Sequence, residues 1–506
     1  MAIGDIVKKH SFYTPDKVAM IIDDREYTFR ELNERTNRVA NFLIGNGIGK
    51  GDRISVLLLN CSEFMEVYFA AAKIGAIFVP LNYRLAPAEL EYQLNDCGSR
   101  LLVFHDEYTA AIEAIRSRVS VEKDKYVVVG DDSPVWAVKY EDAISKYSFG
   151  EPEPEDPVEW DDPQAIMYTS GVTGSPKGAL LPHRKTLFNA LNSDFSIMLG
   201  PGDIFLSSLP LFHSGGLFIV ATPTLFRGAT FITYKKFDPQ KLLKNIEKYR
   251  VTVFFALTTM LNLIVKNENL DDYDLSSLRL FLGGGERTSL AMLEEFAGKG
   301  LYMQTGFGQT ENSLLLFLHE KDTVRKMGSL GVPMFFCDVR ICDENGRFAG
   351  PGKVGEIVVK GPTVMLGYWN RPEDTSRTIV DGWLHTGDLG YHDEEGYFYF
   401  VDRIKDMYRS GGENVYPAEV EKILVGHPKI MNVSIIGVPD EKWGETGKAL
   451  VVPKDGEAIT LEEIHEYLNG KVARYKFPSR MELVDGFPMT ESGKVKKSAI
   501  KEMYGK

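Results

Sequence analysis

The chain has 506 residues, of which 44% are hydrophobic and 25% charged, and its net charge is −13. This length exceeds one ordinary hydrophobic core and predicts at least two domains. The acidic balance argues against nucleic acid as a partner, because phosphate backbones would be repelled.

Alternating strands and helices are predicted over roughly the first 400 residues. The run Arg53–Leu59 reads as a strand, Glu63–Lys73 has helical spacing, and Ala76–Pro80 is again strand-like. The rhythm continues in five further apolar runs, Leu101–Phe104, Tyr126–Val129, Ala165–Tyr168, Val251–Ala256 and Leu278–Leu282. Continuous apolar strands separated by helices predict an α/β fold with mostly parallel sheets that are covered on both faces.

From about Val354 the pattern shifts to shorter strands and glycine turns, which predicts a β-rich part. The segments after Gly412 then read as helix, strand, strand and helix, at Pro417–Leu424, Val433–Val438, Lys448–Pro453 and Leu461–Val472. This is a small α+β domain of about 100 residues. We place the boundary at Asp402, with a large domain over 1–402 and a small mobile domain over 403–506.

The N-terminus lacks the apolar stretch of a secretory signal, and no apolar run approaches the ~18 residues of a membrane span. The cysteines are Cys61, Cys97, Cys337 and Cys342, without zinc-ligand spacing. We expect buried free thiols in a reducing cytosol, and therefore a cytoplasmic protein.

One loop, Tyr168–Gly178, follows an apolar strand and carries hydroxyls, small residues and the ammonium of Lys177. These are the parts of a polyphosphate cradle. It is not a Walker A loop, because Pro176 precedes the lysine. Taken alone, a flexible surface loop is an equal alternative.

Three further segments carry charged groups on glycine turns, Thr305–Glu311, Trp383–Gly390 and Pro488–Lys497. Singly, Glu311 reads equally well as a cap, Asp388 as a turn residue and Lys494 as a solvated charge. Together with the loop and in this order, they resemble the adenylate-forming superfamily of acyl-CoA synthetases, amino-acid adenylation domains and firefly-type luciferases. The resemblance spans Tyr27 to Lys497.

The chain departs from the family pattern at two places. Val172 stands where the family usually has threonine, and Gly283–Glu286 stands where Gly-Gly-Ala-Pro is frequent. The change at Val172 leaves the neighbouring hydroxyls in place. The change at Gly283–Glu286 concerns the wall near the adenine and the acyl pocket, so it affects the detail of binding and not the type of reaction.

The resemblance implies two half-reactions with ATP and CoA as substrates and Mg²⁺ as cofactor. A carboxylate attacks the α-phosphate of ATP to give acyl-AMP and pyrophosphate, and a thiol then displaces AMP. The residues implied for the β- and γ-phosphates are Thr169, Ser170, Gly171, Thr173, Gly174 and Lys177. Those implied at the adenine are Gly284, Gly285, Glu286, Phe307 and Gly308.

The charged groups of the family pattern have separate implied roles. Thr310 would touch the α-phosphate and Glu311 would bind Mg²⁺. Asp388 would accept from both ribose hydroxyls, and Arg403 would hold the ribose or a phosphate. Lys494 would bridge the substrate carboxylate and the α-phosphate.

Family members rotate the small domain between the half-reactions, and Lys405 matches the hinge position. Ser410, Gly411 and Gly412 would then approach the pantetheine arm of CoA. Arg474 and Lys476 would meet the CoA phosphates, with a solvated face as the equal alternative. Trp443 is expected to pack near the same site, with core packing as its alternative.

The acid is expected to be an apolar monocarboxylate with a medium-chain, branched, alicyclic or aryl body. The residues expected near it are His213, Phe254, Phe255, Met260 and Leu314, although a histidine in such a segment is also a common core residue. Two enzymatic alternatives are an adenylating enzyme that loads a separate carrier protein and a luciferase-type oxygenase. A third alternative is a non-catalytic binding protein that kept the fold. The sequence is also compatible with a homodimer.

Overall fold

The computed structural model describes residues 2–169, 176–284, 294, 296–410, 413–489 and 495–505. Two compact units divide the chain. Unit 1 is Met1–Met327, Gly331–Asp338 and Val359–Leu384, and unit 2 is Gly328–Leu330, Val339–Val358 and His385–Lys506. Residues 385–402 thus fall in the unit that contains the C-terminus. The boundary at Asp402 was placed from the change in sequence pattern, and it stays a prediction.

Unit 1 contains an eight-stranded sheet whose central strands are parallel. In spatial order the strands are β19 (Gly367–Tyr368), β9 (Lys177–Pro182), β8 (Pro163–Thr169), β4 (Ile77–Pro80), β3 (Arg53–Leu57), β5 (Leu101–His105), β6 (Tyr126–Val129) and β7 (Val138–Lys139). At one edge β8 and β9 form an antiparallel hairpin, and β19 pairs with β9. The predicted phosphate loop is the connection of this hairpin.

A nine-stranded sheet, also in unit 1, is parallel through its middle. Its strands in spatial order are β16 (Val332–Pro333), β15 (Ser313–Leu318), β14 (Met303–Gln309), β13 (Leu280–Gly284), β12 (Val253–Leu257), β10 (Ile204–Ser207), β11 (Thr230–Thr233), β1 (Val18–Ile22) and β2 (Arg25–Thr28). Strands β10, β12, β13 and β14 run side by side in one direction, so their carboxyl ends share one edge. This is where α/β sheets bind ligands.

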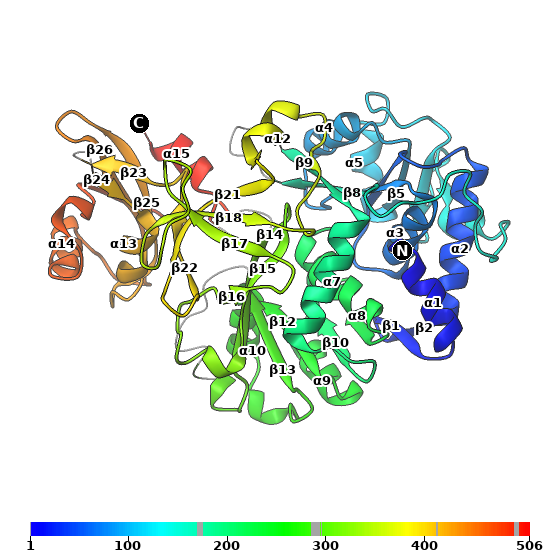
Figure 1. The fold of residues 1–506 in the computed structure, drawn as a ribbon, viewed down its shortest axis with the longest axis horizontal. Coiled ribbons are helices and arrows are strands. Elements are labelled where there is room, and N and C mark those ends of the chain that lie inside the picture. The colour runs from blue at the N-terminus through cyan, green and yellow to red at the C-terminus, as the bar shows by residue number, and fades with distance from the viewer. Residues whose placement is uncertain are drawn as a thin grey trace. The chain divides into compact units, whose positions relative to one another are not determined.

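Helices cover these sheets because their apolar stripes match the apolar strands. Leu90 and Leu94 of helix α4 (Pro87–Cys97) lie in one core cluster with Leu102 and Phe104 of β5. Burying a side chain of this size contributes roughly 1.5–3 kcal/mol. The helices of unit 1 are α1 (Asp5–Tyr13), α2 (Phe29–Gly45), α3 (Ser62–Ile74), α4, α5 (Thr109–Glu113), α6 (Tyr140–Ile144), α7 (His183–Ile197), α8 (Thr222–Phe226), α9 (Pro239–Tyr249), α10 (Thr258–Asn267) and α12 (Pro372–Thr378). Figure 1 shows α2 beside α3 and α7 beside β15.

A third sheet, through which the division between the units runs, has the order β17 (Asp338–Cys342), β18 (Gly355–Lys360), β21 (Trp383–His392) and β20 (Ile379–Val380). Strand β22 (Phe398–Arg403) pairs with β21. It is the β-rich part that the glycine turns after Val354 predict.

Unit 2 ends in an α+β fold around a sheet of β24 (Glu413–Val415), β23 (Tyr408–Ser410), β26 (Gly444–Pro453), β25 (Ile430–Asp440) and β27 (Arg480–Leu483). Its helices are α13 (Pro417–Leu424), α14 (Leu461–Leu468) and α15 (Lys497–Tyr504). Val420 and Leu424 of α13 pack with Val433 and Ile435 of β25 in one core. The predicted fold class is confirmed, and each predicted strand or helix appears within a few residues of its expected bounds. The four cysteines are free and buried, as expected.

Candidate active site

Glu311 lies in the turn between β14 and β15, and its carboxylate is held from two other segments. Its Oε1 accepts a hydrogen bond from the Tyr368 hydroxyl at 3.0 Å and from Thr169 Oγ1 at 3.4 Å. Its backbone carbonyl accepts from the amide of Met365 at 2.8 Å. The predicted magnesium ligand and a predicted phosphate ligand are therefore neighbours, although 142 residues separate them in the sequence.

The turn that presents Thr310 and Glu311 needs an unusual backbone. Gly308 has no room for a side chain, because a Cβ there would lie 1.8 Å from the Ser313 carbonyl oxygen. Ser313 is buried with a φ of 60°, a region that non-glycine residues seldom adopt. Its hydroxyl accepts a hydrogen bond from Lys185, a fully buried lysine of α7.

Burial lowers the pKa of Lys185 from 10.5 to about 7, while the charge of Glu311 acts in the opposite direction. The lysine thus lies within electrostatic reach of the predicted magnesium ligand.

Lys177, the ammonium of the predicted phosphate cradle, begins strand β9. Its Nζ pairs with Asp374 of α12 at 2.7 Å and lies 5.5 Å from the centre of the Tyr368 ring. Both partners of this ion pair are largely buried, at 17% and 26% side-chain exposure. Tyr368 thus contacts the cation on its ring face and the Glu311 carboxylate through its hydroxyl, which makes it the central residue of the cluster.

The acyl side of the site is predicted at the carboxyl edge of the nine-stranded sheet. Gly284 ends β13, and a Cβ on it would lie 3.4 Å from Cζ of the Phe255 ring, so the two residues are neighbours. His213 follows the end of β10, is exposed, and accepts a hydrogen bond from the Gly215 amide through Nδ1. Phe307 belongs to β14 and is partly buried.

Phe254 is a wrong assignment to the acyl pocket. It is 2% exposed and its ring stacks on Phe281 in the core beneath α9 and α10. Because neighbouring residues of a strand point to opposite faces, Phe255 faces the other way. The sequence run Phe254-Phe255 does not reveal which of the two rings is in the core.

In unit 2, Asp388 and Arg403 are direct partners on the paired strands β21 and β22. Arg403 Nε lies 3.3 Å from Asp388 Oδ1, and the aspartate is only 2% exposed. Glu356 supports the bend before Asp388 by accepting from the Gly387 amide at 2.8 Å and contacting His385 Nδ1 at 2.6 Å. The two residues that the family pattern implies for the ribose are therefore adjacent.

Lys405 lies two residues after β22, where the chain turns toward β23. Burial lowers its pKa, and the nearby Arg403 charge acts in the same direction. Asp402 connects this turn to α13 by accepting from the amides of Arg403 (2.7 Å) and Ala418 (2.9 Å). Burial raises the pKa of Asp402 to about 6.

The residues predicted for CoA are dispersed over unit 2. Ser410 ends β23 and is buried, Arg474 is exposed, and Lys476 pairs with Glu419 at 2.7 Å. Trp443 is 48% exposed, so its alternative as a core residue is wrong. The CoA roles stay predictions.

Several predicted residues lie outside the described part of the chain, namely Ser170, Gly171, Thr173, Gly174, Gly285, Glu286, Gly411, Gly412 and Lys494.

Sequence reasoning missed Tyr368, Asp374 and Lys185. Tyr368 reaches the site only because β19 pairs with β9, which brings residue 368 beside residue 179. No local spacing signals such a contact. For Lys185, the one signal in the sequence was a lysine inside an otherwise ordinary helix.

The described residues hold no group of three or more His, Cys, Asp or Glu side chains that could bind a metal by themselves. Mg²⁺ does not need one, since it commonly keeps several waters and binds one or two carboxylates together with substrate phosphates. Glu311 beside the Thr169 hydroxyl fits that requirement. In the same described ranges, no helix is long and apolar enough to cross a membrane.

Comparison with known proteins places these features in one family. The family model described as "AMP-binding enzyme" matches residues 7–369, and "AMP-binding enzyme C-terminal domain" matches residues 419–494. A feruloyl-CoA synthase from an Amycolatopsis species is 40% identical over 505 residues, covering 99% of both chains. An indoleacetate–CoA ligase from Aromatoleum aromaticum is 35% identical, covering 100% of this chain and 99% of the relative.

A solved structure agrees with the sequence matches. ATP-bound MatB from Rhodopseudomonas palustris superposes with a TM-score of 0.90 at 30% identity, covering 100% of this chain and 99% of that one. The residues of the Glu311 cluster from Thr169 to Tyr368 lie within the first matched region. The chain therefore belongs to the AMP-binding enzyme family, the adenylate-forming enzymes.

Proposed function

We propose that this protein is an AMP-forming carboxylic acid–CoA ligase that acts on an apolar, aryl-substituted monocarboxylic acid. The observation that carries the proposal is the Glu311 cluster. It joins Thr169 of β8, Lys177 of β9, Glu311 of the β14–β15 turn and Tyr368 of β19 into one polar group. Carboxylate, hydroxyl and ammonium at one place suit Mg²⁺-bound polyphosphate.

In the first half-reaction a carboxylate oxygen of the acid attacks the α-phosphorus of ATP, and pyrophosphate leaves. The obstacle is the approach of two anions. Lys177 and Thr169 hold the departing phosphates, Thr310 the α-phosphate, and Lys494 the reacting carboxylate. Glu311 holds Mg²⁺, which supplies neutralising charge to the phosphate oxygens when bound.

In the second half-reaction the CoA sulfur attacks the acyl carbon, a new C–S bond forms, and AMP leaves with the oxygen it received. Unit 2 supplies the groups proposed for this step. Asp388 and Arg403 hold the AMP ribose, Lys405 serves as the hinge, and the segment around Ser410 receives the pantetheine arm.

An aryl acid is favoured by the Phe255 ring, whose Cζ and Cε2 atoms lie beside Gly284 at the carboxyl end of β13. An aromatic substrate body gains from stacking or edge contacts with such a ring as well as from burial. The two relatives named above act on feruloyl and indoleacetate groups, which both carry an aromatic ring. The sequence allows a medium-chain, branched, alicyclic or aryl acid, and these observations support the aryl acid.

The test is a panel of carboxylic acids scored for AMP release with and without CoA. It should contain cinnamate-type and arylacetic acids, medium-chain and branched fatty acids, and an α-amino acid of matched size. We expect the aryl monocarboxylates to give the highest kcat/KM, with AMP release dependent on CoA. Acid-dependent ATP–pyrophosphate exchange in the absence of CoA isolates the first step.

The same panel separates the alternatives. Exchange without CoA-dependent AMP release, restored by a phosphopantetheinyl carrier protein, would assign the enzyme to carrier loading. Oxygen uptake with acyl-AMP would indicate the luciferase-type reaction. Absence of exchange with every acid would contradict an adenylating function altogether.

A further inference from the structure

Helix α4 makes hydrogen bonds to both sides of the β8–β9 hairpin, close to where each strand adjoins the connecting loop. This hairpin carries Thr169 and Lys177. The hydroxyl of Tyr168, at the end of β8, donates to Asp96 Oδ2 at 2.8 Å and to the Gln93 carbonyl at 3.2 Å. The hydroxyl of Tyr92 donates to the carbonyl of Pro176, the residue before β9, at 3.0 Å. Residues near both ends of the predicted phosphate loop are thus tied to one helix.

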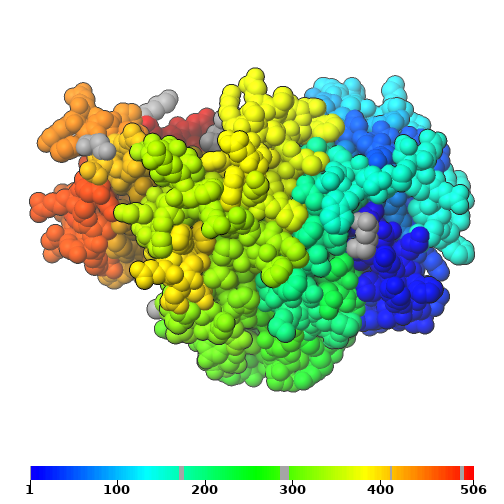
Figure 2. Space-filling model, in the orientation of Figure 1, coloured from blue at the N-terminus to red at the C-terminus, as the bar shows by residue number. Residues whose placement is uncertain are grey.

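A third segment completes the arrangement. Nη2 of the Arg371 guanidinium donates to Asp96 Oδ1 at 2.8 Å and to the Tyr92 hydroxyl at 3.2 Å. The indole N–H of Trp369 donates to the Asp96 backbone carbonyl at 3.0 Å. Figure 2 shows the yellow surface around this segment against the blue surface of the first hundred residues.

Asp96 is the centre of this arrangement. Its side chain is 10% exposed, and each carboxylate oxygen receives a different donor. A carboxylate buried to this degree is expected only where it is paired and hydrogen-bonded. Burial also raises the pKa of Tyr168, so its hydroxyl stays protonated and donates.

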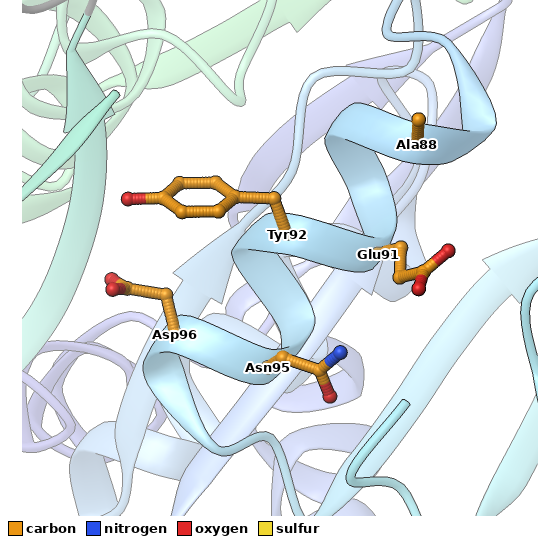
Figure 3. Close-up of a pocket in the computed structure, with 5 residues that line it drawn as sticks. All are labelled: Ala88, Glu91, Tyr92, Asn95 and Asp96. Carbon is orange, nitrogen blue, oxygen red and sulfur yellow. The ribbon is translucent and has the colours of Figure 1, made fainter. Parts of the chain in front are cut away.

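The geometry of α4 separates these residues from their neighbours. Tyr92 and Asp96 are four positions apart and project from one side of the helix, whereas Glu91 and Asn95 project from the other, as Figure 3 shows. These residues, with Ala88, line a shallow hollow of about 470 Å³ on α4. Glu91 pairs with Arg118 at 2.8 Å, and Asn95 donates to the Arg118 carbonyl at 2.9 Å, so that side of α4 serves a different contact.

We propose that Tyr92 and Asp96 form a positioning clamp that fixes the spacing of Thr169 and Lys177, and so sets the affinity for the polyphosphate of ATP. The proposal rests on the proposed function for the identity of the ligand. Neither residue is a catalytic group, because both act through Tyr168, Pro176 and Arg371. The clamp serves the first half-reaction and leaves the second unaffected.

The variants are Tyr92→Phe and Asp96→Asn, with Glu91→Gln as the matched control on the other side of the same helix. Tyr92→Phe keeps the ring and removes one hydroxyl. Asp96→Asn and Glu91→Gln each remove one negative charge, so a general charge effect would appear in both. If Asp96→Asn folds poorly, Tyr92→Phe still tests the clamp by itself.

Dissociation constants for Mg-ATP are measured by calorimetry on the full chain without acid, followed by KM for ATP, acid and CoA. We expect Tyr92→Phe to weaken ATP binding and raise KM for ATP roughly fivefold, the size of one lost hydrogen bond. Asp96→Asn should raise both about tenfold or more. KM for acid and CoA, and thioester formation from supplied acyl-AMP, should stay at wild-type values in all three proteins.

Wild-type ATP affinity in both Tyr92→Phe and Asp96→Asn overturns the clamp, as does an equal loss in Glu91→Gln. Equal losses in both half-reactions also overturn it, because they indicate a general structural role. Failure of the wild-type protein itself to bind ATP contradicts the proposed function instead, so the two failures are distinguishable.

Discussion

The two units bring their predicted site residues together in different ways. In unit 1 the Glu311 cluster collects side chains from β8, β9, β19 and the β14–β15 turn, and hydrogen bonds link Thr169, Glu311 and Tyr368 across long sequence distances. In unit 2 Asp388 and Arg403 meet because they face each other on one antiparallel pair of strands. The first arrangement depends on the whole sheet, whereas the second depends on one hairpin.

This difference indicates how each part responds to change. The polar groups of unit 1 are largely buried and already oriented by their neighbours, so they are suited to one fixed task, the binding of Mg-ATP. In unit 2 the Arg403 side chain is 44% exposed beside the turn that holds Lys405. That segment is suited to a change of backbone conformation between the half-reactions.

The strongest test of the unit 1 arrangement is Glu311→Gln. The amide keeps the size of the side chain but removes the charge proposed to hold Mg²⁺, so acid-dependent pyrophosphate exchange should fall about 100-fold or more. Thioester formation from supplied acyl-AMP should be much less affected. Glu373→Gln is the control, because Glu373 pairs with Arg377 on an exposed part of α12. Similar exchange rates in the two variants would refute the role of Glu311.

The matching test in unit 2 is Lys405→Pro, with Lys405→Ala as its control. Proline fixes φ, so it should block the rotation and slow thioester formation at least about tenfold while acyl-AMP formation proceeds. Alanine removes the side chain but keeps the backbone free, and should preserve both steps. Single-turnover measurements of each half-reaction test this prediction. Equal losses in both steps would contradict the role of Lys405 as a hinge.

A smaller effect is expected for Tyr368→Phe. The change removes the hydroxyl that donates to Glu311 but keeps the ring beside Lys177. Loss of one hydrogen bond to a carboxylate should raise KM for Mg-ATP roughly fivefold, with KM for the acid unchanged. Tyr302→Phe, at an exposed position of the same unit, controls for loss of a phenol. An unchanged KM would show that Thr169 and the turn suffice to orient Glu311.

The smallest effect on catalysis is expected for Lys185→Met, whose main consequence is on stability. The folded-state pKa of about 7 lies below that of free lysine, so the unfolded chain binds the extra proton between about pH 7 and 10.5. The cost of burying the ammonium is therefore complete below pH 7 and disappears as the pH rises through this window. It amounts to up to roughly 5 kcal/mol.

Denaturant unfolding of wild type and Lys185→Met at several pH values between 6 and about 10.5 measures this cost. The stability of the wild type should rise relative to that of the variant across the window. A constant difference between the two proteins would mean that Lys185 does not titrate there. The loss of the hydrogen bond to Ser313 lowers the stability of the variant at every pH, so the slope is the informative quantity.

The sequence by itself determined the α/β class, the order of strands and helices, the family, and the residues of the motifs. These depend on local quantities, since the period of apolar residues selects helix or strand, and glycine and charged residues mark turns. Asp388 with Arg403, and Thr169 with Glu311, are such motif residues, and the structure brings each pair together.

Only the tertiary structure decided which residues support the motifs. Tyr368, Asp374, Lys185, Tyr92 and Asp96 have no distinctive local pattern, and each acts on a residue far away in the chain. The assignment of Phe254 to the acyl pocket failed for the same reason, because the face of a strand that is covered depends on what packs against it. Side-chain partners are set by sheet pairing and burial, which involve the whole chain at once.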